Sequence, residues 1–406
     1  MSLSERQVKR LKKGVKQEQS EAFIHGNRGR KPANTLKEKV REEVVKQALL
    51  PEYEGVNDSH FRDLLEEREG IVLSRSSVRR IRRAAGIFSS RKHRRAKRHP
   101  SRPRKAQSGI LVQVDGSPHD WLEGRGRSMC LVAIIDDASS KVLGATFRQE
   151  EDSDGYFTVL EQMAARYGLP LAIYSDRHTI FVSPKSGRLS IEDELAGKTV
   201  PLTQVGRALE ELGISHCKAL SPQAKGRIER LWGTFQDRLV IEMRLAGVKT
   251  LEEANTFLPD YVEKHNKQFS VAPQELETAF RKAPAKKVLM QILCRHEKRQ
   301  ASNGSTISYE GRTYQMVDTS KTVVPLVPKA QITLLLHRDG TVQASYHDKI
   351  YDLQSLEVKQ SEKLATYGFQ LTPRKAHKPA ADHPWRRTQI NPKKREQIPQ
   401  LTSALS

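Results

Sequence analysis

The stretch that decides the fold is residues 109–119, GILVQVDGSPH, in which a short apolar run leads into Asp115-Gly116. Apolar runs of this length, bounded by turn-forming residues, predict buried strands. Two more runs follow at Cys130–Ile135 and Lys141–Phe147, and the turn residues Asp137–Ser140 join them. The sequence therefore predicts three neighbouring strands, the first of them ending at Asp115.

Helices and strands alternate after these three runs. A helix is expected at Asp154–Tyr167, where Gly168 and Pro170 stop it, and a strand at Leu171–Ser175, which ends at Asp176. Three further elements are predicted: a helix at Pro201–Leu212, a strand at Ile214–Cys217 and a long helix at Gln223–Glu242. Clustered strands followed by alternating helices and strands predict a mixed α/β sheet with helices on its faces.

Three carboxylates stand at positions suited to chemistry: Asp115 and Asp176 at strand ends, and Glu229 on the long helix. Ligands of α/β sheets bind at the rim where strands end. Magnesium prefers oxygen ligands, and a pair of such ions supports in-line displacement at phosphorus. Taken singly, each acid also has an ordinary role as a turn former, a cap or a helix partner of Lys225.

Other polar residues of the same region have simpler explanations. Asp136 and Asp137 are expected to form a turn and not to bind metal. The acids Glu192–Glu194 fit the first turn of a solvated helix capped by Ser190. His178 is expected in a polar loop, and His216 and Cys217 in a strand, because no second Cys/His pair offers a zinc site.

The charge of the chain is unevenly distributed. Its 406 residues carry 70 Lys and Arg against 48 Asp and Glu, a net charge of +22. Residues 1–108 have net +16, residues 109–280 net −6 and residues 281–406 net +12. Basic flanks suit a polyanion, because neutralised phosphates release counterions. Three distant cysteines and the lack of a long apolar run exclude a disulfide scaffold and a membrane span, and favour a cytoplasmic protein.

Residues 35–88 predict an all-α helix-turn-helix unit. Thr35 and Glu38 suggest a capping box, a second helix starts at Asn57 or Asp58, and Ser74 caps a third that ends at Gly86. In the third helix Val78, Ile81 and Ala85 should face inward. The opposite face is expected to meet DNA in the major groove, with these residues: Ser76, Ser77, Arg79, Arg80, Arg82 and Arg83. A solvated basic face is the alternative.

The segments on either side of this unit are basic. Residues 1–34 contain a partial copy of such a recognition helix at Ser4–Leu11 and a Gly/Arg linker, which fits either a truncated unit or a frayed helix. Residues 89–107 hold nine Lys and Arg and no acid. They predict an arm that follows phosphates between two domains.

The C-terminal third predicts a small β-barrel after a basic connector. Short strands are expected at Ile307–Tyr309, Tyr314–Met316, Val323–Val327, Ile332–Leu336 and Thr341–Tyr346, with Asp339-Gly340 as a hairpin turn. The tail (359–406) contains the stretch Thr372–Gln397, which is rich in Pro, Lys and Arg, and is expected to order only when bound.

Four blocks of the chain resemble the integrase-core transposases of bacterial insertion sequences, most closely the ISNCY group, within the class that includes retroviral integrases. The blocks are residues 112–119 (VQVDGSPH), 134–140 (IIDDASS), 174–181 (YSDRHTIF) and 221–236 (SPQAKGRIERLWGTFQ). The resemblance runs from about residue 70 to the segment Asp382–Arg386.

The resemblance implies an RNase H-like core with a catalytic triad of Asp115, Asp176 and Glu229 that binds two Mg²⁺ ions, for which Mn²⁺ can substitute. It implies cleavage at element ends and 3′-hydroxyl transfer into target DNA, by a homo-oligomer on double-stranded DNA in the bacterial nucleoid, with no membrane association. Two departures concern spacing and loop: 52 residues lie between Asp176 and Glu229, and Arg177-His178 replaces the usual Asn-Gly. The polar stretch Ser183–Val200 is the expected insertion.

A third departure concerns DNA contacts. The basic residue that relatives carry two helical turns after the Glu is Gln236 here, so Lys225, Arg227 and Arg230 become the candidates for contacting terminal nucleotides. Two other functions stay open at this point: a non-catalytic DNA-binding regulator derived from a truncated transposase, and a ribonuclease acting on RNA–DNA hybrids.

The expected organisation is multidomain. Its segments are a partial helix-turn-helix and linker (1–34), a helix-turn-helix domain (35–88), a basic arm (89–108), an α/β RNase H-like core (109–272), a basic connector (273–305), a small β-barrel (306–358) and a basic tail (359–406).

Overall fold

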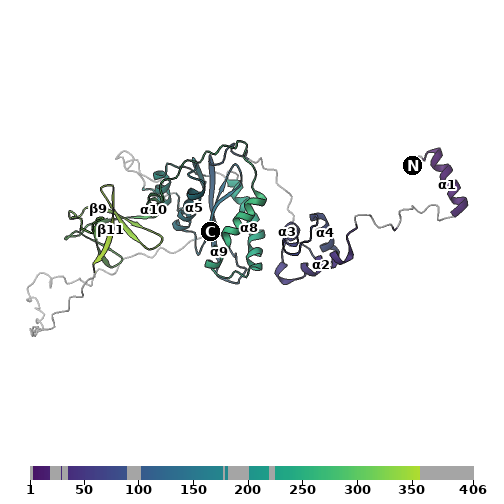
Figure 1. Cartoon of the computed structure of the whole chain (residues 1–406), viewed down its shortest axis with the longest axis horizontal. Helices are drawn as coiled ribbons and strands as arrows, with labels where there is room; N and C mark the ends of the chain where they lie inside the picture. The colour runs from purple at the N-terminus through teal and green to yellow at the C-terminus, as the bar shows by residue number, and fades with distance from the viewer. Residues whose placement is uncertain are drawn as a thin grey trace, which may run out of the picture.

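The computed structural model describes residues 3–18, 29, 35–88, 102–176, 179–181, 201–218 and 225–356. An α/β unit occupies the middle of the molecule, with a curled antiparallel sheet on one side and a three-helix unit on the other (Figure 1). Several predictions fall outside these residues: the basic arm between residues 89 and 101, His178, the stretch Ser183–Val200 and the tail from residue 359.

The central sheet is mixed, as predicted, with the strand order β3-β2-β1-β4-β5. Strands β1 (Leu111–His119), β2 (Met129–Asp136) and β3 (Val142–Arg148) are antiparallel neighbours. Strands β4 (Ala172–Ser175) and β5 (Ser215–Lys218) run parallel to β1 on its other side.

Helices cover both faces of this sheet. Helices α5 (Ser153–Arg166) and α7 (Gln204–Glu211) pack on one face, and α8 (Gly226–Leu245) and α9 (Leu251–Phe269) on the other. Strand β2 is buried throughout because its alternate side chains enter the two apolar cores.

Strand β1 is longer than predicted. It continues through Asp115-Gly116, which we expected to end it, as far as His119. A Cβ atom added to Gly116 would lie 2.6 Å from Cδ of Glu151. The glycine therefore permits the close approach of a side chain and does not form a turn.

The three-helix unit consists of α2 (Glu38–Ala48), α3 (Asp58–Glu69) and α4 (Arg75–Ala84), packed around Val44, Phe61 and Val78. The predicted cap at Ser74 is present, and α3 begins at Asp58, one of the two predicted start residues, with Asn57 as its N-cap. The predicted capping box is wrong, because α2 begins at Glu38 with Lys37 at its N-cap. Ala85 is also exposed instead of buried, because it follows the last helical turn.

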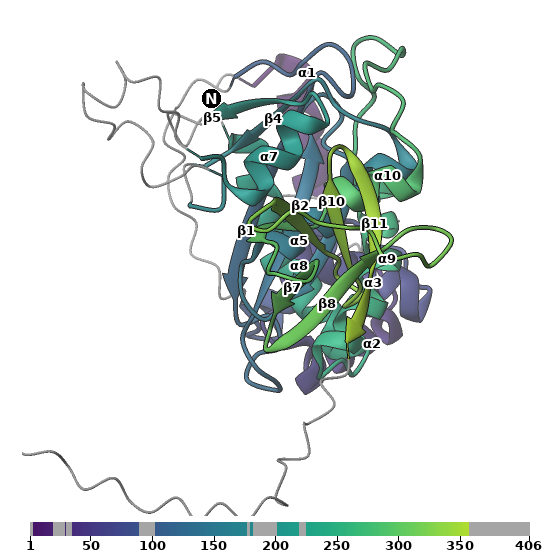
Figure 2. The same cartoon turned by 90° about the vertical axis from the view of Figure 1, so that its left-hand side faces the viewer.

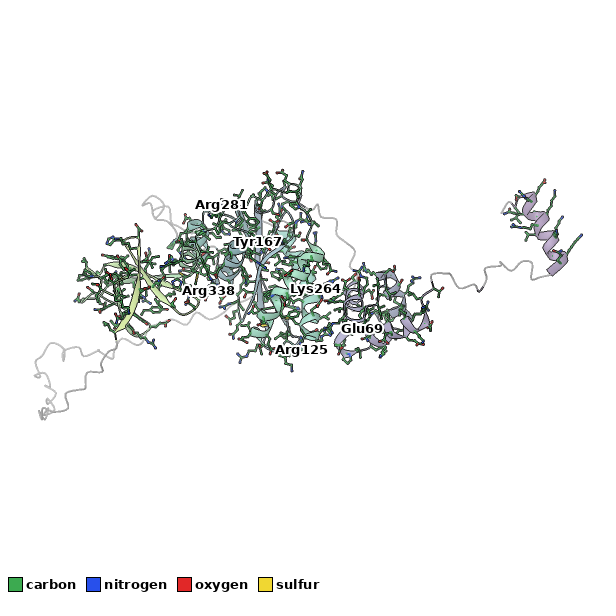
Figure 3. The ribbon with its side chains drawn as sticks, in the orientation of Figure 1. Glu69, Arg125, Tyr167, Lys264, Arg281 and Arg338 are labelled. Atoms are coloured by element: carbon green, nitrogen blue, oxygen red, sulfur yellow. The ribbon has the colours of Figure 1, made fainter. Side chains whose placement is uncertain are left out.

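The three-helix unit docks on the C-terminal half of α8. Ile241 and Leu245 of α8 join its apolar core, and Nε2 of His60 lies 3.1 Å from Oε1 of Glu242. Lys264 of α9 lies 2.9 Å from Glu242 and 2.5 Å from Glu67, and Figure 3 labels it on the side of the core that faces Glu69. Apolar and charged contacts together fix the unit on the core.

The curled sheet replaces the predicted barrel and has the order β6-β9-β10-β11-β8-β7. Its strands β8, β10 and β11 are labelled in Figure 2. Its strands are β6 (Arg295–Gln300), β7 (Thr306–Tyr309), β8 (Arg312–Val317), β9 (Gln331–Leu336), β10 (Val342–Tyr346) and β11 (Lys349–Leu356). Arg338 attaches it to α5 through Thr158, at 2.6 Å, and Glu161.

Two details of this region differ from the prediction. The expected connector contains α10 (Lys286–Ile292) and β6, so the sheet starts before residue 306. The run Val323–Val327 forms only an isolated bridge, between Val317 and Val323. Pro325 lacks the N–H that a paired strand needs, which explains why this apolar run does not join the sheet.

No helix in the described ranges is long and apolar enough to cross a membrane.

Leu239 of α8 tests the packing of the core. It is fully buried, whereas Leu276 is 90% exposed, so the same substitution can be made in opposite environments. We expect Leu239→Ala to lower the free energy of unfolding by about 2–5 kcal/mol, because it opens a cavity. Leu276→Ala should change it by less than about 0.5 kcal/mol. Urea denaturation measures both, and equal effects would contradict the packing described for α8.

The burial of His60 beside Glu242 predicts that the stability of the folded protein depends on pH. Burial lowers the pKa of His60 below its usual 6.5, despite its hydrogen bond with Glu242. The unfolded chain therefore binds more protons than the folded one just below pH 6.5, and the folded state loses stability as the pH falls through that range. Thermal denaturation between pH 7.5 and 5 should show this loss, and His60→Gln should reduce it. An unchanged pH profile in His60→Gln would contradict the prediction.

Candidate active site

One row of side chains on β1 faces helix α8. Val112 and Val114 enter the core on the other face, so Gln113, Asp115 and Ser117 point toward α8. The backbone N–H of Ile228 donates to Oε1 of Gln113 at 3.2 Å. Gln113 thus receives a hydrogen bond from the first turn of the helix and fixes where α8 begins.

Two further contacts continue along the same row. Nε1 of Trp232 donates to Oδ2 of Asp115 at 3.2 Å, and Nε2 of Gln236 donates to Oγ of Ser117 at 3.3 Å. The helix therefore follows β1 from Gln113 to Ser117. Asp115 is held by an indole N–H in a largely buried position.

Asp176 lies level with Asp115. Strands β1 and β4 pair in parallel up to Gln113 and Tyr174, and each aspartate follows two residues later. Ser175, beside Asp176, lies 2.7 Å from Nε2 of His216 and donates to the carbonyl oxygen of Asp176 at 2.9 Å. The sheet register thus brings together two of the three predicted acids.

The ammonium group of Lys225 stands between these two carboxylates. Its Nζ lies 2.6 Å from Oδ1 of Asp115 and 4.0 Å from Oδ2 of Asp176, and its side chain is only 10% exposed. Burial raises the pKa of Asp115, while Lys225 and Trp232 oppose that rise. The pair of acids therefore already surrounds one positive charge.

Glu229 lies on the same face of α8. It follows Lys225 by four positions and precedes Trp232 by three, and both of those residues contact Asp115. Its side chain is exposed. Among the described residues, no three carboxylate, imidazole or thiol groups converge closely enough to hold a metal ion, so Glu229 does not complete a cluster with the two aspartates in this structure.

Asp136 and Asp137 are fully buried. Asp136 accepts from the backbone N–H of Gly109 at 3.0 Å and of Ser139 at 2.8 Å, so it stabilises the turn in which we expected it. Both carboxylates are satisfied by protein groups, which agrees with the structural role predicted for them.

Asp137 connects three segments of the chain. It accepts from Nε2 of Gln113 at 2.8 Å, from the backbone N–H of Lys105 at 3.0 Å and from the guanidinium of Arg102. Arg227 in the first turn of α8 donates to the carbonyl oxygen of Arg102 at 3.0 Å. The end of the predicted basic arm, β1 and the start of α8 thus meet around one buried charge.

The predicted DNA-contacting residues of α4 differ in exposure. Ser76, Arg80 and Arg83 are exposed, and Ser77 and Arg79 are half-buried. Arg82 is a correction: it is 4% exposed, donates to Asp58 at 2.8 Å and lies over the ring of Phe61. Helical periodicity turns Arg82 toward α3, although Arg80 and Arg83 face outward.

The basic candidates near Glu229 also differ. Arg230 is exposed and stays available to a ligand, whereas Lys225 and Arg227 contact protein groups. His216 and Cys217 lie in strand β5, as expected, and the three cysteines are free. Burial raises the pKa of Cys130 and Cys294 to about 12, so neither thiol is ionised at neutral pH.

The sequence interpretation missed the roles of Gln113, Trp232 and the ammonium of Lys225. A signal for them existed, because Gln113 shares the two-residue period of Asp115, and Lys225 and Trp232 share the helical period of Glu229. What the sequence lacked was the register between strand and helix.

Comparison with known proteins identifies relatives along most of the chain. The transposase for insertion sequence IS1202 of Streptococcus pneumoniae is 35% identical, over 96% of this chain and 88% of that protein. The protein y4bF of Sinorhizobium fredii, also described as a transposase, is 35% identical over 79% of this chain and 68% of its own length. No family model matches the chain.

Solved structures show weaker similarity. A simian T-cell lymphotropic virus intasome has a TM-score of 0.31 at 14% identity, covering 70% of this chain and 92% of that chain. The catalytic core of BIV integrase has a TM-score of 0.27 at 20% identity, covering 39% of this chain and 85% of the integrase chain. The catalytic core of HTLV-2 integrase in complex with magnesium has a TM-score of 0.25 at 18% identity. That match covers 37% of this chain and 82% of the integrase chain. On the strength of the two long sequence matches, the chain belongs to the transposases of bacterial insertion sequences.

Proposed function

We propose that this transposase cuts and joins DNA at a single carboxylate site formed by Asp115, Asp176 and Glu229. The observation that carries the proposal is the meeting of Asp115 and Asp176 around one cation, with Glu229 on the facing surface of α8. Acids brought this close repel each other unless a positive charge lies between them. Such a pair, at the edge where β4 ends, is suited to hold a divalent metal.

The donor set fits magnesium. It consists of carboxylate oxygens from a rigid sheet and one helix, the ligands that Mg²⁺ and Mn²⁺ prefer, and the position between the aspartates already accepts the charge of Lys225. Two bound Mg²⁺ ions would supply activation of the attacking oxygen and stabilisation of the leaving oxygen.

The residues around the acids orient them for this chemistry. Trp232 fixes one oxygen of Asp115, and Ser175 holds the backbone at Asp176. Gln113 fixes the first turn of α8, on which Glu229 lies. In the proposed reaction, water cleaves a phosphodiester at the element end, and the freed 3′-hydroxyl then attacks a phosphodiester of target DNA. Neither step needs a covalent protein intermediate.

The basic regions are proposed to hold the DNA. The exposed residues of α4 would bind element ends in the major groove, and the arm and the curled sheet would hold flanking DNA. Because two element ends must be joined to one target, we propose that the chain acts as a homo-oligomer on double-stranded DNA within the bacterial nucleoid.

Substitution of the three acids tests the catalytic half of the proposal. Asp115→Asn, Asp176→Asn and Glu229→Gln should each reduce Mg²⁺-dependent nicking of element-end DNA by at least about a hundredfold, because each removes a charged oxygen ligand. Glu252, an exposed acid in the first turn of α9, provides the matched control Glu252→Gln, which should cleave like the unmodified protein.

DNA binding by the same variants separates the proposal from its rival. Electrophoretic mobility shifts should show element-end binding within about twofold of the unmodified protein, because the acids lie outside α4. If the unmodified protein binds DNA but never nicks it in Mg²⁺ or Mn²⁺, the chain is a non-catalytic DNA-binding regulator. Preference for an RNA–DNA hybrid over duplex DNA would indicate a ribonuclease.

Two adjacent arginines of α4 test the DNA-binding half. Arg83 is exposed, whereas Arg82 is buried against Asp58. Arg83→Ala should weaken DNA binding and reduce the slope of log K against log salt by about 1, as expected when one phosphate contact is lost, with no change in stability. Arg82→Ala should instead lower the unfolding free energy of the helical unit by about 1–3 kcal/mol, because it leaves Asp58 without its guanidinium partner. The reverse pattern would assign the DNA surface to another face of α4.

A further inference from the structure

The position between Asp115 and Asp176 contains a built-in cation. Nζ of Lys225 is within hydrogen-bonding distance of Asp115 and within ion-pairing distance of Asp176. Its side chain is 10% exposed and that of Asp115 is 18% exposed, so water screens their contact poorly. A divalent ion bound by both aspartates would have to occupy the position of this ammonium and take over its role of offsetting the negative charge of the carboxylates.

The connection of Lys225 to the chain allows it to move away. Lys225 lies immediately before the first turn of α8, at the N-cap, and its side chain accounts for none of the hydrogen bonds that cap the helix. The start of α8 is held by Gln113 and Arg227 instead. The lysine side chain can therefore leave the aspartates without unfolding the helix that carries Glu229.

We propose that Lys225 is a resident cation that occupies the metal position of the free transposase and must be displaced before a divalent metal binds. This inference rests on the proposed function, because it assumes that Asp115 and Asp176 bind metal. It also accounts for the position of Glu229, which stays exposed while the lysine offsets one of the two negative charges of the aspartates.

DNA would favour the exchange. A phosphate of bound DNA gives the displaced ammonium another anion to contact, so metal and DNA would each promote binding of the other, as linkage requires. The free protein would then bind metal weakly, and the DNA complex would bind it more tightly.

The direct test measures metal affinity without DNA and without catalysis. Mn²⁺ is titrated into the full chain, and free Mn²⁺ is counted by electron paramagnetic resonance. Lys225→Met keeps an unbranched side chain one heavy atom shorter and removes the charge. We expect this variant to bind Mn²⁺ about tenfold more tightly or better than the unmodified protein, because the charged hydrogen bond no longer competes. Lys225→Gln, a polar variant, serves if the methionine variant does not fold.

Three further variants complete the experiment. Lys225→Arg keeps the charge and should not gain affinity. Lys249→Met removes an exposed lysine beyond the other end of α8 and should leave affinity unchanged. Asp115→Asn should abolish the binding. Equal or weaker Mn²⁺ affinity in Lys225→Met, with binding still lost in Asp115→Asn, would overturn the role of Lys225 alone. Absence of Mn²⁺ binding in every protein would overturn this role and the proposed metal site together.

A second measurement tests the linkage with DNA. After subtraction of Mn²⁺ bound by the DNA itself, a short DNA duplex should raise the Mn²⁺ affinity of the unmodified protein and raise that of Lys225→Met much less. An equal gain in both proteins would overturn the displacement by DNA.

Discussion

The buried charge of Asp137 is the constraint on which the rest of the structure depends. Its side chain is fully inaccessible to water, and an unpaired carboxylate in that position would cost several kcal/mol. The chain satisfies it with donors from Arg102, Lys105 and Gln113. Arg102 and Lys105 belong to the end of the predicted arm, and Gln113 belongs to strand β1. Both segments must therefore pack beside Asp137 for its charge to be satisfied. Gln113 and Arg102 in turn hold the first turn of α8.

Once its first turn is fixed, helix α8 links the parts of the molecule that differ most in sequence. Its beginning carries Glu229, its middle buries Phe235 and Leu239 in the core, and its end enters the apolar core of the helical unit through Ile241 and Leu245. At 1.5 Å per residue, Glu229 and Leu245 are roughly 24 Å apart along one axis. The candidate chemistry and the proposed DNA-binding unit are therefore positioned by the same rigid element.

Charge has different roles in the different parts of the chain. The net charge of +22 conceals a middle region of −6, in which several acids are used internally. Asp136 and Asp137 build turns and connections, Glu242 binds the helical unit through His60 and Lys264, and Asp115 pairs with Lys225. Basic residues are also divided: Arg82 and Arg227 stabilise the fold, while Arg80, Arg83 and Arg230 stay exposed.

The sequence by itself determined the mixed sheet, the order of its elements and the helix cap at Ser74, because local periodicity and capping chemistry act over a few residues. It also indicated Asp115, Asp176 and Glu229 as candidates. It did not determine that β1 continues past Gly116, that Arg82 turns inward, or that Pro325 excludes Val323–Val327 from the curled sheet. Only the tertiary structure placed Lys225 between the aspartates and joined Asp137 to Arg102 and Gln113. Those contacts depend on strand register and on how a helix lies along a strand, and both are set by residues far apart in the chain.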